Sequence, residues 1–454
     1  MSSSNIGQLF ICFGYLGIFL LIGKILRVKI RLFQKLFLPS SLIGGFLALL
    51  LGQYVLGVVS PEVSKTWSAI PGNLINIIFA CMFIGAVIPK FREVWSIAAA
   101  GTTYNYFITS LQWLVGIGIA TFIIAPIWNL PPIVGSIVEI GWAGGHGTAA
   151  GMKEVFESFG YPEIADLGTI SATYGLVFGI VMGIVLINYG VRKKYTKVLR
   201  NPNEISREGL SGIVPKDKVK PFGRQTFEKF SIEPLAFHVS LVLIALILGQ
   251  LIKQWLGAAN NIFNSIPLFP FAMIGGLIIQ LISKVVKVDP LIDKSTVERI
   301  QGTALDFLVV SAMATINLSV VAQYFVPLAI LMIATSIVMV VATLVVAPWF
   351  YPKDWFECAI GDFGTLCGVV AVGLMLLKVV DPEFETAGPQ VFAYKRPFVS
   401  PFTGGGLITS VIPVMIVTMG AVNVILISVG VMIASILVSK FCGLFSFSRT
   451  KTHS

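Results

Sequence analysis

Long apolar runs that carry almost no charge constrain the fold of this chain more than any other feature. A helix needs about 20 mostly apolar residues to cross the hydrocarbon core of a bilayer. The chain has 454 residues, of which 56% are hydrophobic and 12% charged, whereas a soluble domain carries about 25% charged residues. The runs predict an all-α polytopic membrane protein, because only helices and closed barrels satisfy their backbone hydrogen bonds in lipid.

Eleven crossings are expected, five before and six after a basic, polar linker at 192–231. The span near 301–325 is weak, because Asp306, Asn317 and Gln323 interrupt it. The expected spans lie near 6–26, 38–58, 69–89, 99–127, 165–191, 233–256, 267–287, 301–325, 327–350, 391–418 and 420–445.

The basic residues set the expected orientation. The net charge is +10, and an outside N-terminus leaves only Lys65, Lys153 and Lys253 in outside loops. Short loops rich in Lys and Arg stay in the cytoplasm, so we expect the C-terminus inside. The basic residues are not interleaved with aromatic ones, which argues against nucleic-acid binding. The five cysteines form no CxxC pair, so zinc or redox chemistry has no support.

An odd number of crossings before the linker inverts the second half, and the sequence keeps a trace of an internal repeat. FLPSSLIGGFL at 37–47 matches LFPFAMIGGLI at 268–278, with the Pro and the Ile-Gly-Gly at a constant offset of 231 residues. Inverted repeats are common in secondary transporters. We therefore predict two inverted-topology five-helix repeats, 1–191 and 232–419, and one additional helix at 420–445.

Two apolar segments are interrupted by glycines and are too short to cross as straight helices. Glycine permits turns that other residues avoid, and non-helical backbone at membrane depth must line protein or a water-filled cavity. Each half is therefore expected to hold a re-entrant hairpin, the best sequence pointer to a transport site. Segment 131–156 breaks at Gly144-Gly145-His146-Gly147-Thr148, and segment 357–383 at Gly361-Asp362-Phe363-Gly364-Thr365.

The chemistry of these breaks suits a carboxylate and a small cation. The N-terminus of a half-helix offers free N–H groups and a positive dipole end to a carboxylate, while carbonyls and the hydroxyls of Thr148 and Thr365 suit Na⁺. The alternative is that the glycines only let helices pack closely, which does not require His or Asp at the breaks. We expect substrate contacts at Gly144 to Thr148 and at Gly361, Asp362, Gly364 and Thr365.

Several ionisable residues have more than one interpretation. His146 could bind substrate, move a proton or brace the loop, since neutral imidazole both donates and accepts. Asp362 could balance a cation or cap a half-helix. Asp306 could face the bundle interior or the cytoplasm. Lys395 and Arg396 could hold an anionic substrate, the role expected for Arg396, or extend to the cytoplasmic surface.

At these residues the chain resembles the bacterial glutamate:sodium symporter family. The match is strongest at the first glycine motif, continues in Ala172-Thr173-Tyr174-Gly175-Leu176-Val177-Phe178-Gly179, and covers roughly residues 10–415. The resemblance implies a bacterial inner-membrane protein that takes up glutamate or a related carboxylate with Na⁺ as coupling ion and no cofactor. It also implies paired re-entrant loops, a homodimer and an elevator-like movement. With Thr148, Asp362 and Thr365, Thr173 becomes a candidate Na⁺ ligand.

The chain also departs from the family pattern. The second break lacks the histidine and the denser glycines that the family leads us to expect, and Lys395-Arg396 stand where an apolar stretch is usual. A proton-coupled carrier that uses His146 and Asp362 is the main rival interpretation, and a channel is the next. The sequence contains no HExxH, nucleophile elbow or catalytic carboxylate pair, so we do not expect an enzyme.

Overall fold

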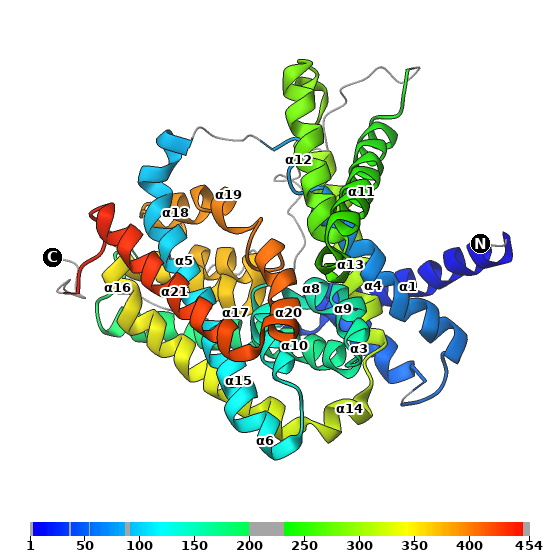
Figure 1. The fold of residues 1–454 in the computed structure, drawn as a ribbon, viewed down its shortest axis with the longest axis horizontal. Coiled ribbons are helices and arrows are strands. Elements are labelled where there is room, and N and C mark those ends of the chain that lie inside the picture. Colours follow the sequence, from blue (N-terminus) through cyan, green and yellow to red (C-terminus); the bar gives the residue numbers. More distant parts are fainter. Residues whose placement is uncertain (1–2, 36–37, 54, 87–90, 199–230, 448–454) are drawn as a thin grey trace. The chain divides into compact units, whose positions relative to one another are not determined.

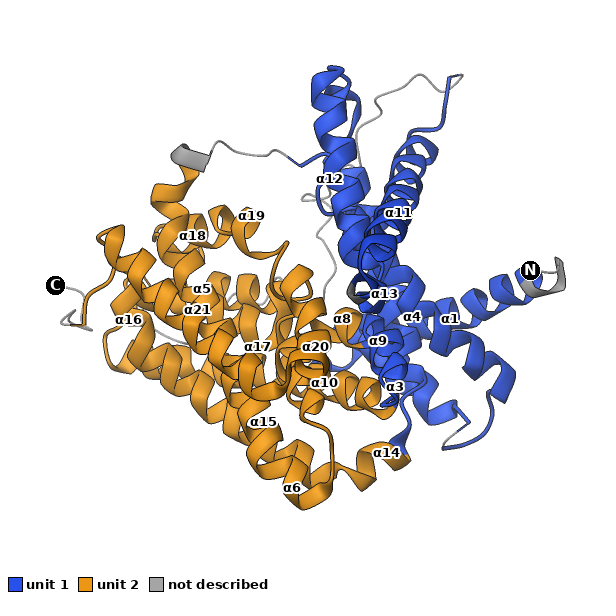
Figure 2. Ribbon diagram, in the orientation of Figure 1, with its two compact units in different colours: residues 1–87, 150–162, 208–318 blue, residues 88–149, 163–207, 319–454 orange. Residues whose placement is uncertain are grey.

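The structure is a computed structural model that describes residues 3–35, 38–53, 55–86, 91–198 and 231–447. Every regular element in these ranges is helical. The chain forms two compact units, and each unit draws segments from both halves of the sequence (Figure 2). Most of the basic linker expected at 192–231 lies outside the described residues.

Unit 1 comprises residues 1–87, 150–162 and 208–318, and unit 2 comprises residues 88–149, 163–207 and 319–454. Unit 1 contains α1 (Ser3–Lys29), α2 (Arg31–Lys35), α3 (Ser40–Leu51), α4 (Pro61–Ala80), α9 (Lys153–Ser158), α11 (Pro234–Ala259), α12 (Phe269–Val285) and α13 (Lys294–Ala314). Unit 2 contains α5 (Phe91–Ile119), α6 (Ala125–Trp128), α7 (Ile137–Trp142), α10 (Glu163–Arg192), α15 (Phe325–Val341), α16 (Ala347–Phe350), α17 (Trp355–Val380), α18 (Gly388–Tyr394), α19 (Arg396–Val399), α20 (Leu407–Met419) and α21 (Ala421–Phe441). The short helices α8 (Gly145–Gly151) and α14 (Leu318–Gln323) lie where the chain passes between the units.

Seven helical stretches of the described chain are long and apolar enough to cross a membrane. This finding confirms the prediction of a polytopic helical membrane protein. By length and composition the seven are Ile6–Lys29, Val94–Trp128, Glu163–Arg192, Pro234–Ala259, Phe325–Phe350, Trp355–Val380 and Ala421–Phe441. Trp355–Val380 consists of two shorter helices that are joined at Gly368 and Val369. Shorter apolar helices are Ser40–Leu51, Pro132–Trp142, Phe269–Val285 and Leu407–Met419.

Two of the expected spans are not continuous helices. The span predicted at 301–325 is wrong as a single element, because α13 ends at Ala314 and the chain leaves the helix before α14 begins. The span predicted at 391–418 is broken between α19 and α20, where residues 400–406 include three consecutive glycines. Length and composition therefore support fewer crossings than the eleven expected.

In unit 1 the two repeated Gly-Gly pairs make matching contacts. Gly44 of α3 packs against the backbone of α1, and Gly275 of α12 packs against the backbone of α11. The second glycines point to helices from the other half of the sequence, Gly45 to α13 and Gly276 to α4. Helices α11 and α12 lie side by side in Figure 1. A Cβ atom at any of the four positions would meet a neighbour, so glycine is needed there for close packing.

In unit 2, α5 and α15 each end in a π-helical turn with the same sequence pattern. Ala-Thr-x-x-x-Ala-Pro occurs at 120–126 and again 222 residues later, and the π turns are Ala120–Ile124 and Ala342–Val346. Thr121 donates to the Ile117 carbonyl at 2.7 Å, and Thr343 donates to the Met339 carbonyl at 2.8 Å. This second internal repeat was not recognised from the sequence, although its Ala-Pro pairs are a usable signal.

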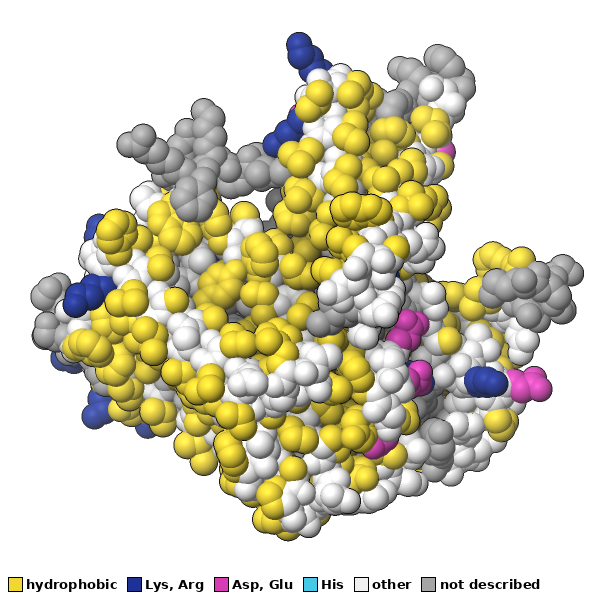
Figure 3. Space-filling view, viewed as in Figure 1, with side chains coloured by type: hydrophobic (Ala, Val, Ile, Leu, Met, Phe, Trp, Pro, Cys, Tyr) yellow, Lys and Arg dark blue, Asp and Glu magenta, His cyan; other side chains and the backbone are white. Residues whose placement is uncertain are grey.

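Apolar side chains cover much of the outer surface of each unit. Figure 3 shows them over α11 and α12 of unit 1 and along the outer helices of unit 2. A soluble protein rarely exposes continuous apolar patches of this kind, so these surfaces are suited to lipid. The exposed residues include Leu243, Ile247, Leu251, Leu281, Ile282 and Val285 in unit 1, and Phe122, Ile127, Leu426, Ile433 and Leu437 in unit 2.

Candidate functional site

The first glycine segment breaks where the sequence predicts. Helix α7 ends at Trp142, and α8 begins at Gly145, whose φ of +74° favours glycine. The chain folds back at this break. A Cβ atom on Gly168 of α10 would lie 3.9 Å from Ile137 on one side of the break and 3.5 Å from Ala149 on the other. The break therefore forms the tip of a short helical hairpin.

The second break lies further along the chain than predicted. Residues 361–365 are helical, and the non-helical residues inside α17 are Gly368 (φ −142°, ψ 37°) and Val369 (φ 63°). The prediction of a break at Gly361-Asp362-Phe363-Gly364-Thr365 was therefore wrong by several residues. Its glycines serve close packing instead, and the chain turns at a Gly-Val pair that carries little sequence signal, since a β-branched residue seldom adopts positive φ.

Helix α17 folds back on itself at this point. In a straight helix, Gly361 and Leu377 would lie about 24 Å apart, yet a Cβ atom on Gly361 would lie 3.9 Å from the Leu377 Cβ. A Cβ atom on Gly364 would lie 2.7 Å from the Cα of Gly373, so the two arms touch through glycines. Each arm extends about 20 Å or less, which is shorter than the hydrocarbon core of about 30 Å.

The tips of the two hairpins meet inside unit 2. A Cβ atom on Gly145 would lie 2.5 Å from Cγ1 of Val369. Helix α10 runs past both tips: a Cβ atom on Gly175 would meet the Trp142 ring and the Cys367 carbonyl, and one on Gly179 would lie 3.3 Å from the Gly368 nitrogen. The glycines of α10 thus allow both chain breaks to approach its backbone.

A third break lies at residues 400–406, next to the first tip. Gly404 has φ +63° and Gly405 has φ +100°. A Cβ atom on Gly404 would lie 3.4 Å from the Ala143 carbonyl oxygen. The three consecutive glycines at 404–406 are the sequence signal for this break, which lies inside the span predicted at 391–418.

The residues of the first motif surround its tip. His146 Nε2 and the Thr173 hydroxyl lie 2.9 Å apart, which brings α8 and α10 together. The Thr148 hydroxyl donates to the Gly144 carbonyl at 3.0 Å, and Thr173 also donates to the Thr169 carbonyl. His146 and Thr148 are both buried. The structure therefore brings Gly144, Gly145, His146, Gly147, Thr148 and Thr173 together.

The residues of the second motif lie on the first arm of the other hairpin, away from its tip. The Thr365 hydroxyl donates to the Gly361 carbonyl at 2.9 Å. The Asp362 carboxylate forms a buried ion pair with Lys395 and accepts a hydrogen bond from the Tyr351 hydroxyl. These contacts join α17 to the segment that connects α18 and α19. Asp362 thus has a cationic partner within the protein.

The two basic residues that follow α18 have different environments. Lys395 is 2% exposed, so it does not reach the surface of the chain. The guanidinium of Arg396 is partly buried and lies 5.4 Å from the centre of the Phe392 ring, at a distance suited to cation–π attraction. The expected role of Arg396 in substrate binding stays a prediction.

Sequence reasoning missed Glu139, a buried carboxylate close to the first break. It lies on α7, four residues before Ala143, and is fully buried. Glu139 and Asp362 are 223 residues apart, close to the offset of the two π turns. Aligned in this way, Glu139 and Asp362 occupy matching positions on the first arms of the two hairpins, and Gly145 matches Gly368. The glycine spacing in the sequence alone instead aligns His146 with the neighbourhood of Asp362.

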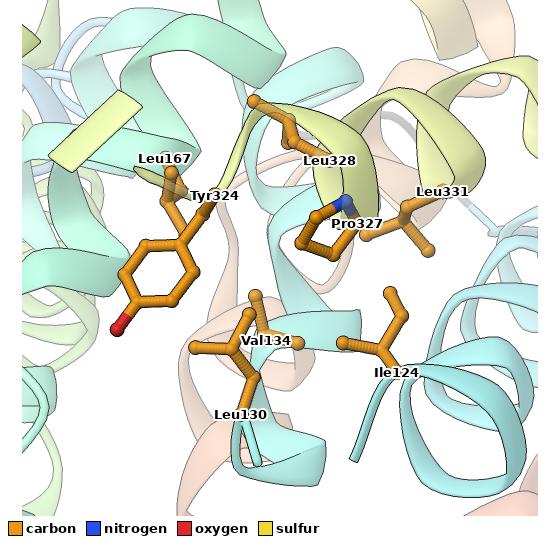
Figure 4. A pocket seen from close by; sticks show the side chains of 8 residues that line it. All are labelled: Ile124, Leu130, Val134, Leu167, Tyr324, Pro327, Leu328 and Leu331. Atoms are coloured by element: carbon orange, nitrogen blue, oxygen red, sulfur yellow. The ribbon is translucent and has the colours of Figure 1, made fainter. Parts of the chain in front are cut away.

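An apolar pocket elsewhere in unit 2 lacks groups that bind a carboxylate. Figure 4 shows its lining, in which the Tyr324 hydroxyl is the only polar side-chain group. It is lined by Ile124, Leu130, Val134, Leu167, Tyr324, Pro327, Leu328 and Leu331. The polar side chains around the three breaks are therefore the better candidate site.

Taken together, the described residues define a polytopic helical membrane protein with chain breaks and buried polar groups inside one unit. The chain belongs to the sodium/glutamate symporter family, whose model matches residues 10–361. It is 24% identical over 381 residues to the sodium/glutamate symporter of Escherichia coli K12, covering 83% of this chain and 88% of that protein. The sodium/glutamate symporter of Shigella flexneri matches to the same extent. The resemblance seen in the glycine motif is confirmed, and the family is one of transporters, not enzymes.

Proposed function

We propose that this protein is a secondary active transporter that couples Na⁺ to the uptake of glutamate or a related carboxylate across a bacterial plasma membrane. One observation carries the proposal: the tips of two helical hairpins meet in the interior of unit 2, where backbone groups leave helical pairing beside buried polar side chains. Family membership supplies the ion and the substrate class. Na⁺ acts as the coupling ion, and no cofactor takes part.

In this proposal the substrate binds beside the first tip. Gly144 to Thr148 provide backbone groups and one imidazole, and His146 presents a neutral ring that can donate or accept. The hydroxyls of Thr148 and Thr173, with carbonyls freed at the break, are the proposed oxygen ligands of Na⁺. Asp362 can join them only by exchanging its present partner, Lys395. The Thr365 hydroxyl, like that of Thr148, keeps lone pairs available while it donates to a carbonyl.

The proposed architecture is a pair of inverted repeats, 1–191 and 232–419, followed by the helix at 420–445. Three matches support it: the Gly-Gly contacts of α3 and α12, the π turns of α5 and α15, and the carboxylates Glu139 and Asp362 at matching positions of the two hairpins. The hairpins at 131–156 and 357–383 would enter the membrane from opposite sides. We further propose a homodimer in which unit 2 moves like an elevator against unit 1.

Uptake of labelled glutamate into proteoliposomes tests this function. An inward Na⁺ gradient should drive accumulation above the external concentration, because each ligand favours the same state of the protein. Equal uptake with K⁺ in place of Na⁺ would reject the coupling. Accumulation driven by a pH gradient without Na⁺ would favour the proton-coupled carrier. Flux that never exceeds equilibration would point to a channel.

Arg396 provides a separate test of the substrate site. If its guanidinium pairs with the substrate carboxylate, Arg396→Ala should raise the KM for glutamate with little change in kcat. If the side chain only packs on Phe392, KM should stay at the wild-type value. Phe392→Leu is the matched control, since it removes the ring contact and keeps the charge.

A further inference from the structure

Glu139 is buried in unit 2 among groups that are all uncharged. Its Oε1 atom accepts hydrogen bonds from the Gly404 N–H at 2.7 Å and from the Thr409 hydroxyl at 2.9 Å. The indole of Trp113 lies beside the same carboxylate. These contacts tie the first hairpin to the third chain break, between α19 and α20.

The other oxygen of this carboxylate has no partner. Glu139 is fully buried, and its Oε2 atom accepts no hydrogen bond from any described residue. No described Lys, Arg or His forms an ion pair with it. A buried ionised carboxylate without a compensating charge is strongly unfavourable, so Glu139 needs a cation or a proton that the described residues do not supply.

The second hairpin contains a buried carboxylate whose charge is compensated by a cation. Asp362 occupies the matching position on its own hairpin, and the Lys395 ammonium pairs with it. Asp362 and Lys395 are 1% and 2% exposed, so the pair is closed to solvent. One carboxylate of the repeated pair therefore has a tethered cation, and the other does not.

The surroundings of Glu139 supply further oxygen atoms. The Thr409 hydroxyl touches the carboxylate directly, and the Ala143 carbonyl lies near Gly404, whose N–H binds the same carboxylate. Carboxylate, hydroxyl and carbonyl oxygens are the ligands of hard cations.

We propose that Glu139 holds a Na⁺ ion, in the place that the Lys395 ammonium takes at Asp362. The identity of the ion rests on the proposed function. The ion would lie between the first hairpin and the third break, so that its binding joins α7 to α20. Glu139 is then an ion ligand in addition to Thr148 and Thr173. Because the Lys395 ammonium already compensates Asp362, the two hairpins together require one fewer mobile cation.

Na⁺ binding can be measured without any substrate. Purified full-length protein in detergent would be titrated with NaCl at constant ionic strength, with choline as the replacement cation, and the thermal unfolding midpoint followed. Wild type should show a saturable rise with Na⁺. Glu139→Gln should raise the apparent Kd for Na⁺ at least about tenfold, because even supporting residues around a metal contribute about 10–100-fold.

Two controls keep the result specific. Asp381→Asn makes the same change at another fully buried carboxylate of unit 2, whose two oxygens both accept hydrogen bonds, and its Na⁺ response should match wild type. Glu139→Asp keeps the charge and should retain a weaker response; it also replaces Glu139→Gln if that variant does not fold. Direct binding of radioactive ²²Na⁺ to the same preparations checks the thermal result.

Three outcomes would overturn the inference. The first is an unchanged Na⁺ midpoint in Glu139→Gln. The second is an equal rise with choline or K⁺. The third is a pH-dependent midpoint that Na⁺ does not shift and that Glu139→Gln abolishes, which would mean that a proton occupies the site. If instead Na⁺ binds at Glu139 but a Na⁺ gradient does not drive glutamate uptake, the proposed transport function is rejected and the proposed Na⁺ site at Glu139 is retained.

Discussion

At the scale of single residues, the interior of unit 2 is organised by charge compensation. Asp362 sits on an apolar helix and is stabilised by Lys395 and by the Tyr351 hydroxyl. An isolated charge at this depth would be costly, and buried ions are tolerated when they are paired and hydrogen-bonded. The ion pair thus explains why two charged residues can occur within otherwise apolar segments.

The pair predicts strong coupling between two substitutions. Lys395→Met should destabilise the protein by about 3–5 kcal/mol, because it leaves the buried Asp362 without its cation. Adding Asp362→Asn should recover most of the loss, since both charges are then gone. Chemical or thermal unfolding in detergent measures the cycle. Losses that simply add would contradict a direct interaction.

Replacing Gly145 should disrupt the tip of the first hairpin and abolish transport. Its positive φ and its approach to Val369 both exclude a larger residue, so Gly145→Val should abolish Na⁺-driven uptake while the protein still folds. Gly160 has a φ of +83° and no atom near its missing Cβ. Gly160→Val therefore carries similar backbone strain without the contact, and uptake should continue. Transport by Gly145→Val would contradict the contact between the tips.

At the scale of elements, glycines allow helical arms to pack closely enough to form hairpins. The arms of α17 touch at Gly361, Gly364 and Gly373, and a larger side chain would force them apart. The same logic applies where α10 passes both tips at Gly175 and Gly179. Helix α17 therefore differs from a spanning helix of the same length because of what packs against it.

The arm contact predicts a stability loss that depends on position. Gly364→Leu should lower the free energy of unfolding by about 1–3 kcal/mol, the usual cost of overpacking, and should reduce uptake as the hairpin opens. Gly118→Leu, on α5, has open space around its missing Cβ and should leave stability nearly unchanged. Thermal unfolding of both variants in detergent compares them. Equal losses would reject the packing argument.

At the scale of the whole molecule, the excess of basic residues on one side predicts the orientation. Loops rich in Lys and Arg stay in the cytoplasm, which gives an outside N-terminus and a cytoplasmic C-terminus. A green fluorescent protein fused to the C-terminus should fluoresce in bacterial cells, and alkaline phosphatase fused there should be inactive. The reverse pattern would contradict the predicted topology.

The sequence was sufficient for the membrane class, the family and the first break. Hydrophobic runs report membrane crossing directly, because lipid imposes the same length and composition on any spanning helix. Gly144 to Thr148 marked the first break for a similarly local cause: the left-handed backbone at Gly145 needs glycine. The Gly-Gly pairs of α3 and α12 were also visible as a repeat before their contacts were known.

The second break, the ion pair and the environment of Glu139 emerged from the three-dimensional packing. Gly361 and Gly364 look like a turn in the sequence, yet they are helical, and the chain turns at Gly368 and Val369. The small size of these two glycines lets the opposing arm approach. Lys395 could not be matched to Asp362 from spacing, since long-range contacts leave no periodic signal. Whether a buried charge has a partner depends on distant segments coming together, and that is settled only when the chain is packed.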